Sequence, residues 1–159
     1  MTEMAELKKI TIEDVSKMPR EDLINFLARL GIEGDIMFKK GRIDVLEVKV
    51  SLILREIGMP AHLPGHAYVR KAIMYAVKEP TIMKAVTEKL YPSVAKDFSS
   101  IPSRVEKGIS YAIEVAWLRG DKNILSGYFG CTIDNSSGKP TNSEFIEIIS
   151  NKIRLDLKK

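Results

Sequence analysis

The chain has little that would mark it as secreted or membrane-embedded. Its single cysteine, Cys131, excludes an internal disulfide and suits a reducing compartment. No apolar run reaches the length of about 18 residues that a membrane-spanning helix needs. Residues 1–9 carry charges where a signal peptide needs an apolar core. We therefore expect a cytoplasmic protein without a membrane span.

Patterns of catalytic or metal-binding residues are also missing. The sequence shows no nucleophile–base pair, no carboxylate dyad and no metal cluster at a meaningful spacing. His62 and His66 are four residues apart, which would suit a metal on a helix. Pro64 and Gly65 lie between them, so we expect structural or surface histidines instead. The sequence predicts neither an enzyme nor a bound metal or cofactor.

The length and apolar content of the chain are sufficient for one helical domain with its own core. The 159 residues are 45% hydrophobic, and the net charge of +4 permits nucleic-acid binding without demanding it. A short helix with the apolar stripe Leu23, Phe26, Leu27 and Leu30 ends at Gly31. Residues 32–43 read as a connector. We therefore predict an N-terminal extension, 1–43, and an all-α domain, 44–159.

Helical periods continue through the second region. Asp44 and Glu47 predict a capping box for a helix that runs to Gly58, although alternation over residues 43–50 also permits a strand. We predict a turn at 60–65, a helix at 68–78, a helix from Pro80 that carries Ile82, Val86 and Leu90, and a short helix at 123–129. Thr141 to Glu144 form a second capping box, which predicts the start of a final helix. Four apolar residues of this helix are expected to face the core, namely Phe145, Ile148, Ile149 and Ile153.

Residues 91–119 predict a helix-turn-helix. The first helix spans 92–98, the turn is 98–100 and the second helix spans 102–119. Ala95 is small enough to let the second helix cross closely. The second helix has one apolar face, formed by Val105, Ile109, Ala112, Ile113, Ala116 and Trp117. Its other face carries short polar side chains and a basic residue; the face is formed by Ser103, Glu106, Lys107 and Ser110. Such a face suits reading of the DNA major groove, but it also occurs as a solvated face in helical proteins that bind no DNA.

Several segments in order resemble one family. They are Pro60-Ala61-His62, Leu90-Tyr91-Pro92, Ser103-Arg104-Val105-Glu106, Ala112-Ile113-Glu114-Val115-Ala116-Trp117 and the run from Lys139 to Ile146. From about Asp44 to the C-terminus the chain resembles the DNA-binding effector domain of the stage-zero sporulation protein A family, the master response regulators of endospore formation. The resemblance implies a compact multi-helix effector domain whose helix-turn-helix binds a short promoter box of the TGTCGAA type.

The resemblance also implies partners. Double-stranded promoter DNA is the first, with tandem self-association on DNA and RNA polymerase as candidate further partners, which would place the protein at the nucleoid. Family members normally carry a phosphoaccepting receiver before this domain. About 43 residues precede it here, fewer than the roughly 100 that a receiver needs. We expect the Leu23–Leu30 helix to take over part of that role, by pairing chains or by docking onto the effector domain.

The candidate site residues lie on and beside the second helix. We predict that Glu106, Lys107 and Ser110 read base edges and that Lys96, Ser100, Ser103 and Arg104 contact the DNA backbone. Glu106 could accept from a cytosine amine or pair with a neighbouring cation. The family carries arginine at the positions of Lys107 and Ser110, so we expect altered box preference. Gly108 lies mid-helix, where glycine costs about 0.5–1 kcal/mol relative to alanine.

A second reading keeps the scaffold but not the DNA. In this alternative the chain is a protein-interaction or antagonist module that pairs with a full-length regulator and binds DNA weakly. The loss of two outward arginines favours it, because a lysine is a flexible point charge and a serine is too short to reach the same base. Affinity for a duplex at moderate salt separates the two readings.

Overall fold

The computed structural model describes residues 17–19, 21–23, 25, 45–130 and 138–158. Within these ranges the chain forms helices and turns and no strand, so the all-α prediction is confirmed. The predicted strand alternative near residue 45 is wrong, because helix α4 spans Val45–Ile57. Asp44 and the connector 32–43 lie outside the described residues, as do most of the predicted Leu23–Leu30 helix and Cys131.

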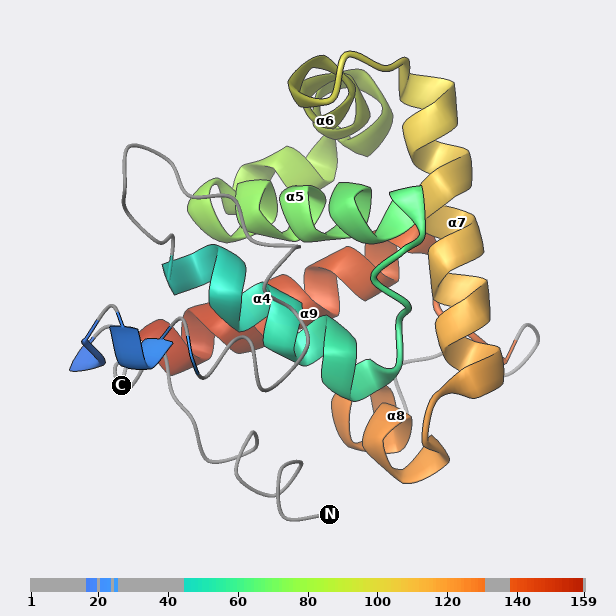
Figure 1. The fold of residues 1–159 in the computed structure, drawn as a ribbon. Coiled ribbons are helices and arrows are strands. Elements are labelled where there is room, and N and C mark those ends of the chain that lie inside the picture. The colour runs from blue at the N-terminus through green and yellow to red at the C-terminus, as the bar shows by residue number, and fades with distance from the viewer. Residues whose placement is uncertain (1–16, 20, 24, 26–44, 131–137, 159) are drawn as a thin grey trace.

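Helix α5, Pro64–Lys78, lies at the centre of the fold. It packs against α4, against α7 (Pro102–Arg119) and against α9 (Asn142–Leu157). In Figure 1, α5 lies above α4 and α9, and α7 stands upright to the right of all three. Residues spaced by three or four along α5 are fully buried, among them Val69, Ala72, Ile73 and Ala76. This spacing gives α5 apolar contacts on more than one side.

Helix α5 begins earlier than the sequence predicted. Residues 60–65 were expected to form a turn, but Pro64 occupies the first position of the helix, where its missing N–H costs nothing. Gly65 and His66 are therefore buried in the first turn of α5. His62 lies just before the helix and is exposed, so the two histidines do not share a regular helical face.

The segment after α5 also departs from prediction. A single helix was expected from Pro80 through Leu90. The chain instead forms a 3-10 helix, Pro80–Lys84, a break at Ala85 and a π-helix, Val86–Leu90, which runs into α6 at Tyr91–Asp97. Ile82 and Leu90 are nevertheless buried and Val86 is partly buried against the core, so the apolar spacing predicted the inward-facing positions but not the helix type.

The remaining helices follow the sequence closely. Helix α7 has the predicted bounds, and α8 spans Lys122–Phe129 after a side-chain cap from Asp121. The capping box of Thr141 and Glu144 at the start of α9 is confirmed. Ile146 of α9 is fully buried although it was not predicted to be, whereas Ile148 is only partly buried.

Aromatic and polar contacts join these helices. The predicted core residue Trp117 is partly buried and meets the Phe129 ring edge-on, with 4.9 Å between ring centroids. Arg70 of α5 pairs with Glu47 of α4 through Nε and Oε1 at 3.5 Å, and both side chains are about nine-tenths buried. A buried pair of this kind fixes the relation of two helices, because removing either partner leaves an uncompensated charge.

Candidate DNA interface

A side chain of α5 supports the turn between α6 and α7. Ser99 takes the left-handed conformation with φ 51°, and the backbone N–H of Ser100 donates to the carbonyl of Ala95 at 2.8 Å. The hydroxyl of Tyr68 donates to Ser100 Oγ at 3.4 Å. The Tyr68 ring meets Phe98 edge-on at 5.3 Å between centroids. One α5 side chain thus contacts two of the three residues of the turn.

The end of α6 is tied to α5 as well. The Tyr75 hydroxyl donates to Asp97 Oδ2 at 2.5 Å, and Lys71 Nζ lies 3.8 Å from the same oxygen. The hydrogen bond to the Asp97 carboxylate raises the pKa of Tyr75 to about 12, so the phenol keeps its proton at neutral pH. The neighbouring Lys96 is exposed.

Helix α7 has two distinct faces, as the sequence predicted. Val105, Ile109, Ala112, Ile113 and Ala116 are buried. All five polar residues singled out on this helix are exposed, namely Ser103, Arg104, Glu106, Lys107 and Ser110. Ser100 in the turn is half-buried. Together with Lys96, these residues form a polar surface over α6, the turn and the first half of α7.

A groove runs beside this surface. It has a volume of about 690 Å³ and lies between α7, the π-helix before α6 and the start of α9. Its α7 wall contains Ser103, Glu106, Lys107 and Ser110, and the opposite wall contains residues 139–143. The three base-reading candidates therefore share one concave surface. The Glu106 side chain is exposed on the α7 wall of this groove.

Asn142 joins the two walls of the groove. Its Nδ2 donates to the carbonyl of Glu106 at 3.1 Å and to the Tyr91 hydroxyl at 3.2 Å. Burial raises the pKa of Tyr91. Sequence reasoning missed this role, because it treated Asn142 only as the residue after the capping threonine. The bond fixes the distance between α9 and the turn of α7 that carries Glu106.

The close crossing of α5 and α7 explains Gly108. A Cβ atom built on Gly65 would lie 1.9 Å from the carbonyl oxygen of Gly108, far inside van der Waals contact. A Cβ atom on Gly108 would lie 2.9 Å from the Tyr68 ring. The mid-helix glycine therefore lets α7 pack directly on α5, next to Tyr68, which contacts the turn.

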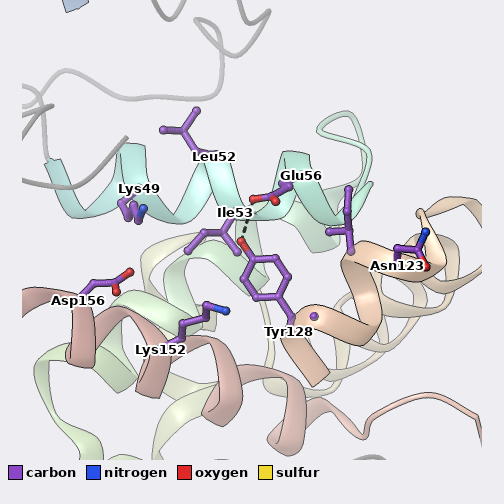
Figure 2. Close-up of a pocket in the computed structure, with 10 residues that line it drawn as sticks. Lys49, Leu52, Ile53, Glu56, Asn123, Tyr128, Lys152 and Asp156 are labelled. Atoms are coloured by element: carbon purple, nitrogen blue, oxygen red, sulfur yellow. Dashed lines mark hydrogen bonds between the residues drawn. The ribbon is translucent and has the colours of Figure 1, made fainter. Parts of the chain in front are cut away.

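A second hollow, of about 370 Å³, lies between α4, α8 and α9. In Figure 2 the Tyr128 side chain points between α4 and α9, and its hydroxyl donates to Glu56 Oε2 at 2.8 Å. Lys152 Nζ lies 4.3 Å from the centre of the Tyr128 ring. Burial, and then the bond to Glu56, raise the pKa of Tyr128. These contacts of Tyr128 with Glu56 and Lys152 join α8 to α4 and to α9.

Other classes of site are not seen in the described part of the chain. It contains no group of three or more His, Cys, Asp or Glu residues placed to hold a metal ion. None of its helices is both long and apolar enough to cross a membrane. His66 is 3% exposed, and burial, followed by the charge of Arg70, lowers its pKa to about 4. A neutral buried imidazole of this kind is part of the core.

The comparison with known families agrees with the geometry. Residues 50–153 match the model of the family described as the C terminal of the sporulation initiation factor Spo0A. The match covers more than half of the chain, and the chain belongs to this family. It is a family of DNA-binding domains. The predicted family and the helix-turn-helix fold are thereby confirmed, whereas the individual DNA contacts stay predictions.

Proposed function

We propose that this Spo0A C-terminal family member is a sequence-specific transcription regulator that inserts α7 into the major groove of promoter DNA. The observation that carries the proposal is the exposed polar surface on the first half of α7. It stands over a buried apolar stripe and is held in place from α5 by Tyr68 and Tyr75. A fixed helix with a free polar N-terminal half is what major-groove reading requires.

The proposed contacts divide by chemistry. Glu106 would accept from a cytosine amine, Lys107 would donate to guanine O6 or N7, and Ser110 can serve either kind of edge. Four residues at the turn and the helix start would contact phosphates; they are Lys96, Ser100, Ser103 and Arg104. The phosphate contacts fix the register of the helix and carry no sequence information themselves.

The base preference follows from Lys107 and Ser110. Arginine grips guanine with a rigid two-pronged fork, and neither residue can replace that fork. We therefore expect this chain to bind the TGTCGAA-type box more weakly than arginine-bearing relatives do. Lys107→Arg and Ser110→Arg together should strengthen binding to the box by roughly 1–3 kcal/mol if a fork reaches its guanine. The gain on a scrambled duplex should be much smaller, because only phosphate attraction can improve there.

A competition titration tests this proposal. The wild-type chain and the double variant are each titrated with the box and with the scrambled duplex at one fixed salt concentration. The same two substitutions at exposed positions away from the polar surface, Lys122→Arg and Ser126→Arg on α8, add the same single positive charge and serve as the control. Equal gains on both duplexes would show that positions 107 and 110 do not read bases.

The rival reading, a protein-interaction module, makes a different prediction. Helix α7 also exposes Tyr111 and Leu118, at 57% and 80%, beyond the polar surface. If the chain shows no duplex binding at low salt but co-migrates with a full-length regulator, the interaction reading replaces ours. Our proposal includes tandem self-association on DNA and contact with RNA polymerase. It also includes docking of the N-terminal extension onto the effector domain, which the burial of Leu23, at 4% exposure, supports.

A further inference from the structure

Ile101 breaks a local sequence rule at the start of α7. The residue before a helix is commonly Ser, Thr, Asp or Asn, whose side-chain oxygen accepts from a free backbone N–H. Asp121 and Thr141 do this for α8 and α9. Ile101 occupies the same position before α7 and makes no such bond. A departure from the capping rule needs a compensating reason.

Packing does not supply that reason. Leu63, the apolar residue before α5, is partly buried against the core, whereas Ile101 is 53% exposed. Phe98, the other large apolar residue exposed at this end of α7, is accounted for by its edge contact with Tyr68. Ile101 thus presents an apolar side chain to solvent between Ser100 and the exposed Ser103.

The backbone at Ile101 is fixed. Its carbonyl accepts from the N–H groups of Arg104 and Val105, each at 3.1 Å. Its conformation is extended, with φ −122° and ψ 152°, as a residue before proline prefers. The Ile101 side chain is therefore attached to a fixed backbone position at the N-terminal end of α7. In a recognition helix, this end approaches the base edges.

We propose that Ile101 contacts the C5-methyl group of a thymine, a specificity contact additional to Glu106, Lys107 and Ser110. Thymine is the base that presents a methyl group in the major groove, and an apolar side chain is its natural contact. Removing one such methyl from an apolar contact should weaken binding by about fourfold. This inference rests on the proposed function, because it requires α7 to lie in the groove.

Deoxyuridine tests the contact, since it differs from thymidine only in lacking this methyl group. The full chain first selects its preferred duplex from a random-sequence pool. Each thymine of that duplex is then replaced singly, and affinity is measured at fixed salt. The wild-type chain should lose about fourfold at one thymine. Ile101→Ala should bind the methylated and unmethylated duplexes equally. The control Leu118→Ala, at the far end of α7, should keep the wild-type loss.

Ile101→Ser separates reading from folding. Serine is a good capping residue, so this variant should melt at a higher temperature than the wild type and still lose the thymine preference. Three outcomes would each overturn the inference and leave DNA binding intact. The wild-type affinity could be unchanged by removal of any thymine methyl, the selected duplex could contain no thymine, or the methyl effect could persist in Ile101→Ala. Absence of any selected duplex would contradict the proposed function itself.

Discussion

At the scale of single residues, His66 is the titratable group with the clearest consequence for stability. It is 3% exposed in the first turn of α5, and burial with the nearby Arg70 charge lowers its pKa from 6.5 to about 4. The folded chain therefore keeps this imidazole neutral over a pH range in which the unfolded chain protonates it. Because the unfolded state binds more protons there, stability must fall as the pH falls.

The expected pH window follows from these two values. The contribution of His66 is fully present above pH 6.5, is lost as the pH falls from 6.5 towards 4, and amounts to about 3 kcal/mol over that range. Urea unfolding at a series of pH values measures it, with His66→Gln as the variant that cannot titrate. The wild-type free energy of unfolding should fall more steeply than that of the variant. Parallel curves between pH 6.5 and 4.5 would contradict the burial argument.

Other single residues show what local patterns can and cannot reveal. The capping role of Thr141 was predicted from Glu144 three residues later, because both partners lie within one turn. The adjacent Asn142 bonds the Glu106 carbonyl at 3.1 Å, 36 positions away in the chain. Similarly, glycine at position 108 lowers helix propensity, and its structural reason, the close contact with Gly65, lies 43 residues earlier in the chain. Contacts between distant segments leave no signal in the spacing of either one.

At the scale of elements, the crossing of α5 and α7 decides where the polar surface stands. Gly65 and Gly108 meet backbone to backbone, so the distance between the two helices is set by the absence of two side chains. Beside this contact, Tyr68 supports the turn through Phe98 and Ser100. Any side chain at position 65 must push α7 away from the tyrosine that orients its N-terminal end.

Gly65→Ala should therefore destabilise the fold. The added Cβ would lie 1.9 Å from the Gly108 carbonyl oxygen, and overpacking of this kind costs about 1–3 kcal/mol or more. Gly127→Ala in α8 is the matched control, because nothing lies within 4 Å of its added Cβ. That variant should gain roughly 0.5–1 kcal/mol from helix propensity. Thermal unfolding of both variants measures the contrast, and a stable Gly65→Ala protein would show that the helices cross farther apart.

The helices themselves were predictable to different degrees. Helices α7 and α9 carry long periodic stripes; the predicted bounds of α7 and the predicted start of α9 at its capping box are confirmed. The start of α5 was missed because Pro64 and Gly65 resemble a turn, although proline suits the first position of a helix. The 3-10 and π segments after Pro80 bury the predicted Ile82 and Leu90 with a different backbone. Side-chain spacing identifies buried positions more reliably than it identifies helix type.

At the scale of the whole molecule, net charge alone is too small to explain DNA binding. The chain has 25 basic and 21 acidic residues, for a net charge of +4. An interface must instead depend on where the charges lie. Lys96 and Arg104 are exposed on the proposed polar surface, whereas Lys122 is exposed at the start of α8. Figure 1 shows α8 at the opposite end of the fold from α6. These positions allow local contact to be separated from overall charge.

The dependence of duplex affinity on salt concentration distinguishes local phosphate contacts from the effect of overall charge. Each phosphate contact by a lysine or arginine releases counterions, so log affinity falls with log salt at a slope of about −0.9 per contact. Lys96→Gln and Arg104→Gln should each make the slope shallower by about 0.9. Lys122→Gln removes the same single charge but lies far from the proposed contacts, so its slope should match the wild type. If all three variants shift the slope equally, overall charge attracts the DNA and α6 and α7 are not the interface.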